Sequence, residues 1–268
     1  MPGRNPLHTT SDESAEPLSR HAGRNSALFR LTVTFIVLVI FTFTGVEGWR
    51  AWRDYQQAFA TARDSVTNLA RATAQHAEDA IRQVDVLTDA LAERVQGDGL
   101  QNMDVPRIHA LMQQQARIMP QLHGLFIYDA SGQWVVTDKT GTPEAANNAD
   151  RDYFNYHRTH TDPNVRISDV VRSRSTDEYI LPISRRLNNP DGSFAGVLLG
   201  TIRVSYFVDY YGDFKIDDRG ALVLALRNGR ILVRRPFLAP VLGKTLEDSE
   251  IFKRYLPVAD EGVVEVKA

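Results

Sequence analysis

The stretch that decides the fold is "STDEYILPISRRLNNPDGSFAGVLLGTIRV", Ser175–Val204. Two runs rich in Ile, Leu and Val, a composition typical of strands, flank the segment "NNPDGS". Asn188, Pro190, Asp191 and Gly192 are the residue types that supply the backbone conformations of a tight turn. The sequence therefore predicts an antiparallel hairpin here.

Further strands and a short helix are predicted on both sides of this hairpin. Upstream, "LHGLFIYD" (Leu122–Asp129) and "QWVVTDK" (Gln133–Lys139) form a strand pair around the turn "ASG". Downstream, "SYFVDYYGDF" predicts a short helix, and "ALVLALRNGRILVRR" predicts a second hairpin on Asn228–Gly229. "GVVEVKA" (Gly262–Ala268) predicts one more strand. The lack of βαβ alternation, of GxGxxG and of a P-loop argues against a nucleotide-processing fold.

Two helices precede the strands. Residues 49–100 predict a long stalk helix, because no Gly or Pro occurs from Trp49 to Gln96 and apolar residues recur at helical spacings. "GDG" at Gly97–Gly99 ends it, and its apolar face can pack on its own domain or against a dimer partner. A second amphipathic helix follows, with Asp104 as its cap and Pro106 in its first turn.

The N-terminal part predicts a membrane anchor. "LTVTFIVLVIFTFTGV" (Leu31–Val46) carries no charge, and residues 28–48 are about long enough to cross a bilayer. Trp49 and Trp52 stand where interfacial aromatic anchors belong. A cleaved signal peptide and a buried core helix are the alternatives. We favour an uncleaved anchor with residues 1–27 as a disordered cytoplasmic tail, because the leader is long and no small-x-small site closely follows.

Composition narrows the function classes. The chain has 268 residues, of which 43% are hydrophobic and 24% charged, the values of an ordinary globular protein. A formal net charge of -2 provides no bulk electrostatic basis for binding nucleic acid. The chain contains no cysteine, which excludes disulfides, thiolate catalysis and Cys-based metal sites.

In this order, the elements resemble the double Cache sensor domains, paired PAS-like modules on the outside of bacterial receptors. The resemblance rests on a long helix after a membrane span, then "LHGLFIYDASGQWVVTDK", "DRDYFNYHR" and the Val170–Ile202 stretch, and it covers Trp49 to the end. It implies an α+β fold with an N-terminal transmembrane helix, a stalk helix and two antiparallel-sheet modules. Residues 101–219 would be the membrane-distal module and residues 220–268 an incomplete membrane-proximal one.

The resemblance also implies a function. The Val170–Ile202 stretch is most similar to the sensor regions of membrane-bound diguanylate cyclases. The chain would be the periplasmic sensor region of a bacterial inner-membrane receptor, dimeric through its long helix, relaying to a cyclic-di-GMP output beyond Ala268. No GGDEF-type loop, EAL motif or kinase phosphorylation helix occurs, so we expect a fragment, a truncated reading frame or a stand-alone sensor, without enzyme activity. The alternative is a membrane-anchored protein-interaction domain with no small ligand.

The resemblance points to "ADRDYFNYHRTH", Ala149–His160, as a ligand helix, for which Asp150 is the expected N-cap. Amino-acid-binding members offer an Arg-x-Trp-Tyr run there, and Arg151–Asp152–Tyr153–Phe154 is the matching run. Arg151 would hold a carboxylate, with the aromatics beside it. The family's later aspartate, which receives the ligand's amino group, is replaced by Thr201, Ile202 and Arg203. This argues against an α-amino acid and leaves a small anionic or amino-acid-like solute.

The segment "VVRSRSTDEY" adds hydrogen-bond donors that suit a small carboxylate or dicarboxylate. Alternatively, Arg172 and Arg174 only hold the loop by pairing with Asp169, Asp177 or Glu178. His157, His160 and Asp162 do not have the HExxH spacing of a metal site. Ser173 and Ser175 lack the GxSxG context of a catalytic serine. We therefore predict no catalytic, metal or cofactor site. The predicted ligand-binding residues are Arg151, Tyr153, Phe154, His157, Arg172, Arg174, Ser175, Tyr179 and Thr201.

Overall fold

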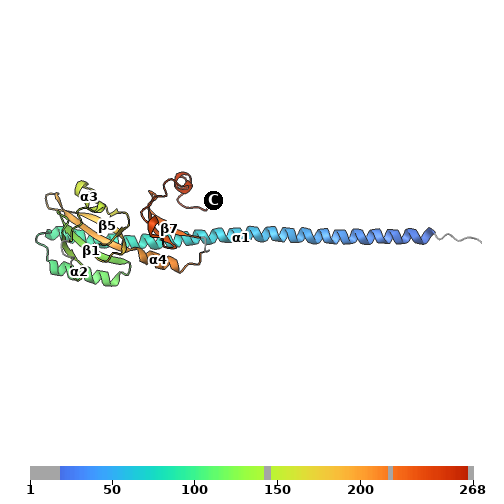
Figure 1. The fold of residues 1–268 in the computed structure, drawn as a ribbon, viewed down its shortest axis with the longest axis horizontal. Helices are drawn as coiled ribbons and strands as arrows, with labels where there is room; N and C mark the ends of the chain where they lie inside the picture. The colour runs from blue at the N-terminus through green and yellow to red at the C-terminus, as the bar shows by residue number, and fades with distance from the viewer. Residues whose placement is uncertain (1–18, 142–145, 217–219, 265–268) are drawn as a thin grey trace, which may run out of the picture. The chain divides into compact units, whose positions relative to one another are not determined.

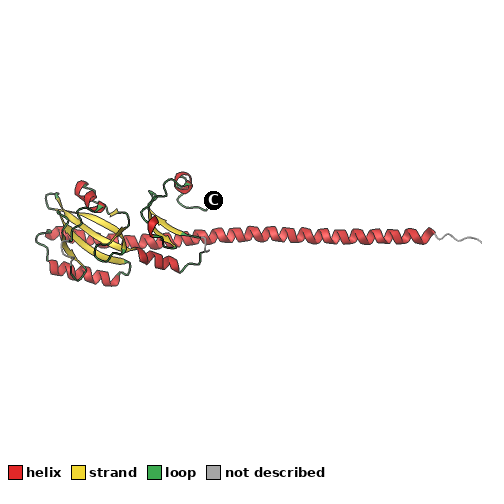
Figure 2. Cartoon of the chain, in the orientation of Figure 1, coloured by secondary structure: helices red, strands yellow, loops and turns green. Residues whose placement is uncertain are grey.

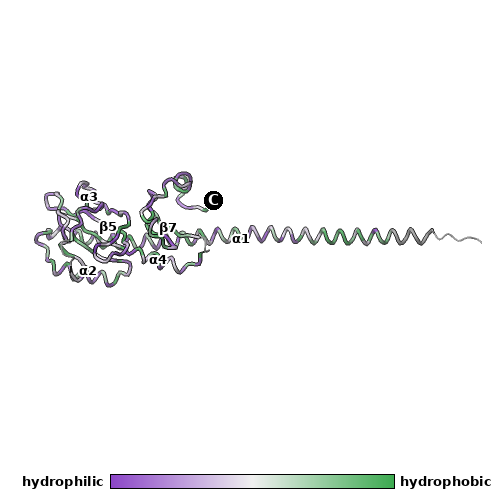
Figure 3. The backbone as a smooth tube through the Cα atoms, in the orientation of Figure 1, coloured by the Kyte–Doolittle hydropathy of each residue, from purple (hydrophilic) through white to green (hydrophobic). Residues whose placement is uncertain are grey.

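The computed structural model describes residues 19–141, 146–216 and 220–264, with side chains from residue 27 onward. It divides into two compact units, residues 1–65 and residues 66–268. Helix α1, Ser19–Asp98, contributes to both, and the predicted continuous stalk helix is therefore confirmed. From Ala27 onward it is long and apolar enough to cross a membrane by length and composition, and none of its most apolar stretch is buried. Figure 3 shows the hydrophobic stretch of α1 in green.

The predicted disordered tail is wrong over part of its length. Residues 19–27 are helical, while residues 1–18 lie outside the described residues. Each residue added to an existing helix loses its backbone freedom but gains one hydrogen bond, whereas starting a helix fixes several residues for one bond. A helix therefore extends readily beyond the apolar run at its centre.

The unit from residue 66 contains a six-stranded antiparallel sheet (Figure 2). Its strand order is β2-β1-β6-β5-β3, and β4 also pairs with β5. The predicted hairpin is confirmed, since β5 and β6 pair from Ile180 with Arg203 to Asn188 with Phe194. The strands are β1 Leu122–Asp129, β2 Trp134–Thr137, β3 Arg166–Ile167, β4 Val171–Arg172, β5 Tyr179–Asn188 and β6 Phe194–Arg203.

The two faces of this sheet carry separate apolar clusters. Because side chains alternate along a strand, Leu125 and Ile127 of β1 face one side and Phe126 and Tyr128 the other. The first face packs against α1 and α2, Val105–Ile118. The second packs against α3, Asp152–Thr159, and Figure 1 shows α2 and α3 on opposite sides of the sheet. The site described below lies on the α3 side.

A glycine in β6 allows α1 to approach the sheet closely. A Cβ atom added to Gly200 would lie 2.6 Å from Val84 Cγ1 and 3.0 Å from Thr88 Cγ2, both of α1.

The start of α2 follows its sequence prediction, because the Asp104 side chain accepts a hydrogen bond from the Arg107 amide at 3.1 Å.

The remaining elements are α4, Val204–Gly212, and a two-stranded sheet of β7, Leu222–Ala225, and β8, Ile231–Arg235. Both the short helix and the second hairpin were predicted, and Gly229 in the turn has a φ of +84°. Two short helical turns follow, Ala239–Val241 and Ile251–Tyr255.

The strand predicted over Gly262–Ala268 is wrong for residues 262–264, which form no strand, and residues 265–268 lie outside the described part. A strand requires a neighbour to pair with, and β7 and β8 pair only with each other among the described strands.

Candidate ligand-binding site

A pocket lies on the α3 side of the six-stranded sheet. Its aromatic wall comes from the two neighbouring strands β1 and β2, where the Phe126 and Trp134 ring centroids are 5.0 Å apart and those of Tyr128 and Trp134 5.9 Å. Sequence reasoning missed these three residues, because the strand register decides which side chains face the pocket. The other lining residues are Asn148, Arg151, Tyr153, Val171, Arg172, Ser173, Arg174, Ser175, Ile180 and Leu199.

Asn148 ties the polar part of this pocket together. Its amide nitrogen donates to the hydroxyls of Tyr128, at 3.1 Å, and Tyr153, at 2.6 Å. Its amide oxygen accepts from Trp134 Nε1 at 3.0 Å and from Arg174 at 3.4 Å. All four hydrogen-bonding positions of the amide are therefore used, although only 4% of the residue is exposed.

Two of the three pocket arginines already have carboxylate partners. Arg172 pairs with Asp177 and Arg174 with Asp150, each at 2.6 Å. The Arg172 pair is one that the sequence left open, whereas the sequence did not indicate Asp150 as the partner of Arg174. The hydrogen bond from Arg174 lowers the pKa of Asp150. Asp150 is consequently not the N-cap of α3, as the sequence predicted; Arg151 occupies that position, without a side-chain cap.

Arg151 is the exception. Its NH2 group donates to the Arg172 carbonyl at 2.9 Å, while its buried Nε has no hydrogen-bond partner. Among the described residues it forms no ion pair. A buried guanidinium nitrogen without an acceptor is costly, and a carboxylate oxygen would satisfy it.

Phe154 and His157, two further predicted ligand residues, do not line the pocket. Both are buried where α3 packs on the sheet. The Phe154 ring lies edge-on to Phe194, with centroids 5.5 Å apart. His157 Nε2 lies 3.0 Å from the Ser184 hydroxyl, and burial lowers the His157 pKa to about 4. These side chains hold α3 in place.

Tyr179 also lies outside the pocket. Its ring stacks beneath the Arg172 guanidinium, 4.6 Å from the ring centroid, and lines a separate hollow with Val208 of α4 and Phe237. Arg172 thus extends from the pocket to Tyr179. One side of the segment that joins β4 and β5 lines the pocket, and the other side lines the separate hollow.

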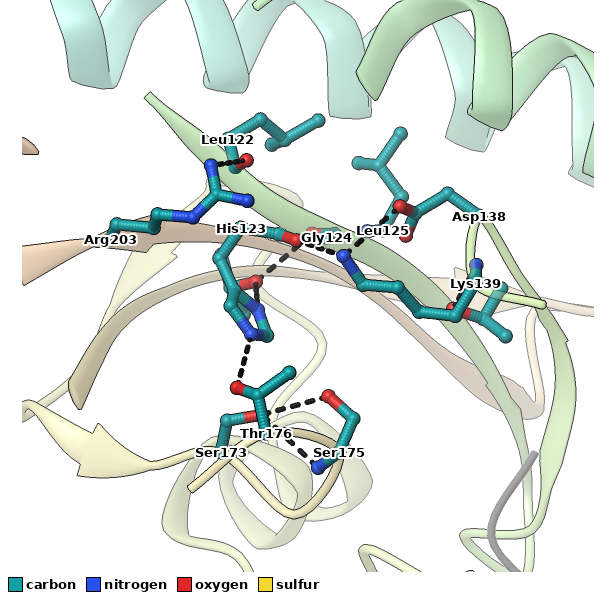
Figure 4. Close-up of polar contacts among 12 residues, drawn as sticks. Leu122, His123, Gly124, Leu125, Asp138, Lys139, Ser173, Ser175, Thr176 and Arg203 are labelled. Carbon is teal, nitrogen blue, oxygen red and sulfur yellow. Dashed lines mark hydrogen bonds and ion pairs between the residues drawn. The ribbon is translucent and has the colours of Figure 1, made fainter. Parts of the chain in front are cut away.

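Thr201, the last predicted residue, is buried and contacts His123, whose polar surroundings are shown in Figure 4. His123 Nδ1 lies 3.0 Å from the Thr201 hydroxyl, which itself donates to the Gly124 carbonyl, and Nε2 lies 2.8 Å from the Thr176 hydroxyl. Burial, with the nearby Lys139 and Arg203, lowers the His123 pKa to about 4, so the ring is neutral. His123, which sequence reasoning missed, therefore connects β1 and β6 to the loop that carries Ser173 and Ser175.

The pocket is small. The empty space among its lining atoms is about 260 Å³, a figure that includes the part open to solvent. The Arg172 side chain, at the edge of the pocket, is 54% exposed. Among residues 27–141, 146–216 and 220–264, no cluster of three or more His, Asp or Glu side chains could hold a metal ion.

The chain therefore consists of an apolar N-terminal helix and an antiparallel sheet that carries helices on both faces and a pocket on one. The chain belongs to the Cache domain family, whose model matches residues 55–267. A comparison with curated proteins finds no match.

Solved structures agree with this assignment. The extracellular domain of rpHK1S-Z16, a proposed histidine kinase, is 30% identical, with a TM-score of 0.62, over 71% of this chain and 77% of that one. The ligand-binding domain of the Pseudomonas aeruginosa PAO1 amino acid chemoreceptor PctC, solved with GABA, is 16% identical (TM-score 0.53; 71% and 83% covered). That of the Pseudomonas fluorescens chemoreceptor CtaA, solved with L-serine, is 15% identical (TM-score 0.51; 66% and 73% covered). The last two show the fold alone.

Proposed function

We propose that the chain is the extracytoplasmic sensor region of a bacterial membrane receptor and binds a small carboxylate-bearing solute in the pocket beside α3. The observation that carries this proposal is Arg151, whose buried Nε has no acceptor and whose charge has no partner among the described residues. Membership of the Cache family supports a sensor role, as does the likeness to solved sensor domains of receptors.

Five of the predicted residues would contact the ligand directly: Arg151, Tyr153, Arg172, Arg174 and Ser175 all line the pocket. Arg151 would bind the carboxylate, and the Ser175 and Tyr153 hydroxyls would orient it. Phe154, His157, Tyr179 and Thr201 would act indirectly, by fixing α3 and the loop between β4 and β5.

The proposal extends to the membrane and to signalling. The apolar part of α1 would anchor the chain in the inner membrane, with residues 66–268 in the periplasm. Phe59 and Val66 of α1 are exposed, and would pack against a second copy in a homodimer. Ligand binding would favour one of two arrangements of α1 in that dimer and so control a cytoplasmic output, for which we propose cyclic-di-GMP synthesis.

The fluorescence of Trp134 offers a direct test of ligand binding, because this side chain lines the pocket. The chain contains three tryptophans, so Trp49→Phe with Trp52→Phe leaves Trp134 as the sole reporter. The full chain in detergent micelles is titrated with carboxylates, amino acids, amines and neutral amides. We expect carboxylates to change the Trp134 emission, and Arg151→Ala to weaken their binding about tenfold or more.

Arg158→Ala is the matched control, because Arg158 is exposed on the same helix and, among the described residues, its side chain hydrogen-bonds only to Asn155. It should bind like the parent. A folded protein that responds to no carboxylate would refute the proposal.

The small free space in the pocket favours a second candidate, a membrane-anchored domain that binds a protein and no small ligand. The same titration separates the two, since this candidate predicts an unchanged Trp134 emission with every solute.

A further inference from the structure

The charges around the pocket can be counted one by one. Of its three arginines, Arg172 is neutralised by Asp177 and Arg174 by Asp150. Only Arg151 remains, so the site carries about one uncompensated positive charge. The sequence alone left a dicarboxylate open as a ligand; the pairing seen in the structure leaves one guanidinium for one anionic group.

The rest of the pocket lining offers no carboxylate for an ammonium group. None of the described lining residues is Asp or Glu, and the two neighbouring carboxylates are already engaged by arginines. An amino group bound here would add a positive charge beside the unpaired Arg151 and would find no free carboxylate, which is unfavourable in a partly buried site.

Part of the pocket lining is apolar. Phe126 and Trp134 form an edge-to-face pair there, and Val171, Ile180 and Leu199 complete the surface. Phe126 and Leu199 belong to the buried cluster on this face of the sheet, whereas Trp134 and Val171 are only half-buried. Contact with this wall stabilises a ligand whose body is aliphatic or aromatic, because apolar surface is removed from water. The wall forms no hydrogen bond with a second polar group on the ligand.

We propose that the pocket selects a monocarboxylate with a short apolar or aromatic body and no amino group, in preference to α-amino acids and dicarboxylates. This inference rests on the proposed function and specifies its ligand class. The carboxylate accepts from Arg151 Nε, and the body lies against Phe126 and Trp134. Arg174 stays with Asp150 and Asn148, where it borders the site without contributing net charge.

The net charge of the pocket leads to a second, independent prediction about Asp150. Asp150→Asn removes the partner of Arg174 and adds one net positive charge to the pocket. The variant should therefore gain affinity for a dicarboxylate relative to a monocarboxylate, by about tenfold. Asp152→Asn is the matched control, because Asp152 pairs with Arg166 on the outside of α3 and is not a lining residue.

The test uses ligands that share one skeleton. The full chain with Trp134 as sole reporter is titrated with butanoate, L-2-aminobutanoate, 4-aminobutanoate, succinate and butanamide. A second series of 3-phenylpropanoate, L-phenylalanine and benzylsuccinate examines the aromatic wall. We expect butanoate and 3-phenylpropanoate to bind about tenfold or more tightly than their amino and dicarboxylate analogues, and the amide not to bind.

Each outcome has a separate meaning. An amino acid or a dicarboxylate that binds as tightly as its monocarboxylate analogue, with Arg151→Ala still reducing affinity, would overturn this inference and leave the proposed function standing. An Asp150→Asn variant with the parent's ranking would overturn the charge argument. Failure of every carboxylate to bind would overturn the proposed function itself, and the inference with it.

Discussion

Asn148 shows how much of the pocket depends on one residue. Its amide joins Tyr128 of β1, Trp134 of β2, Tyr153 of α3 and the Arg174 side chain. The sequence contains no sign of this role, because Asn148 sits in a loop as one of two adjacent asparagines and its partners come from four separate segments. Arg151, Tyr153, Arg172 and Arg174 could be predicted, since each belongs to a local cluster of charged and aromatic residues.

Replacing Asn148 with Ala should destabilise the domain. The change leaves the buried Trp134 Nε1 and the Tyr153 hydroxyl short of a partner, at a cost of about 1–3 kcal/mol in the free energy of unfolding. Urea unfolding followed by Trp134 fluorescence measures this. Asn155→Ala on α3 removes an asparagine whose side chain contacts the exposed Arg158, and should change stability by less than about 0.5 kcal/mol. Equal effects of the two substitutions would contradict the assigned role.

Among the elements, the contact between α1 and β6 is the one most sensitive to side-chain size. Gly200→Ala would place a methyl group 2.6 Å from Val84 Cγ1, and should destabilise the domain by about 1–3 kcal/mol as α1 is forced away from the sheet. Gly97→Ala, near the end of the same helix, meets no atom within 4 Å and should be neutral or stabilising by up to about 1 kcal/mol. Chemical unfolding of both variants checks this. A Gly200→Ala protein as stable as the parent would show that the approach is looser than described.

The elements were predictable where their determinants are local. The turn residues of "NNPDGS" fixed the β5–β6 hairpin, and Asp104 with Pro106 fixed the start of α2. The N-cap of α3 was not predictable, because Asp150 meets Arg174, which is distant in sequence. The strand predicted over Gly262–Ala268 failed over its described residues for a similar reason, since its alternating pattern alone cannot supply a partner strand.

The stability of the whole molecule should depend on pH because two histidines are buried in their neutral form. Burial lowers the pKa of His123 and of His157 to about 4, against about 6.5 in an unfolded chain. Between these values the unfolded chain binds more protons, so stability falls as pH is lowered from about 6.5 to about 4. Each histidine contributes at most about 1.4 kcal/mol per pH unit in that window.

Urea unfolding of the full chain across this pH range measures the effect. His157→Gln, which keeps a polar group near Ser184, should reduce the slope, whereas replacing the exposed His160 with Gln should leave it unchanged. A free energy of unfolding that stays constant from pH 6.5 to pH 4 would contradict the buried neutral state of both rings.

The central claim is that Arg151 serves a ligand and not the fold. Among the described residues its side chain makes one hydrogen bond, to the Arg172 carbonyl, so its loss should cost at most about 1 kcal/mol of stability. The measurement that tests the claim most directly compares Arg151→Ala with the parent in two quantities, the Kd for the tightest carboxylate and the free energy of unfolding without ligand. We predict a Kd raised about tenfold or more at nearly unchanged stability. An unchanged Kd with stability reduced by more than about 2 kcal/mol would show that Arg151 is a structural residue.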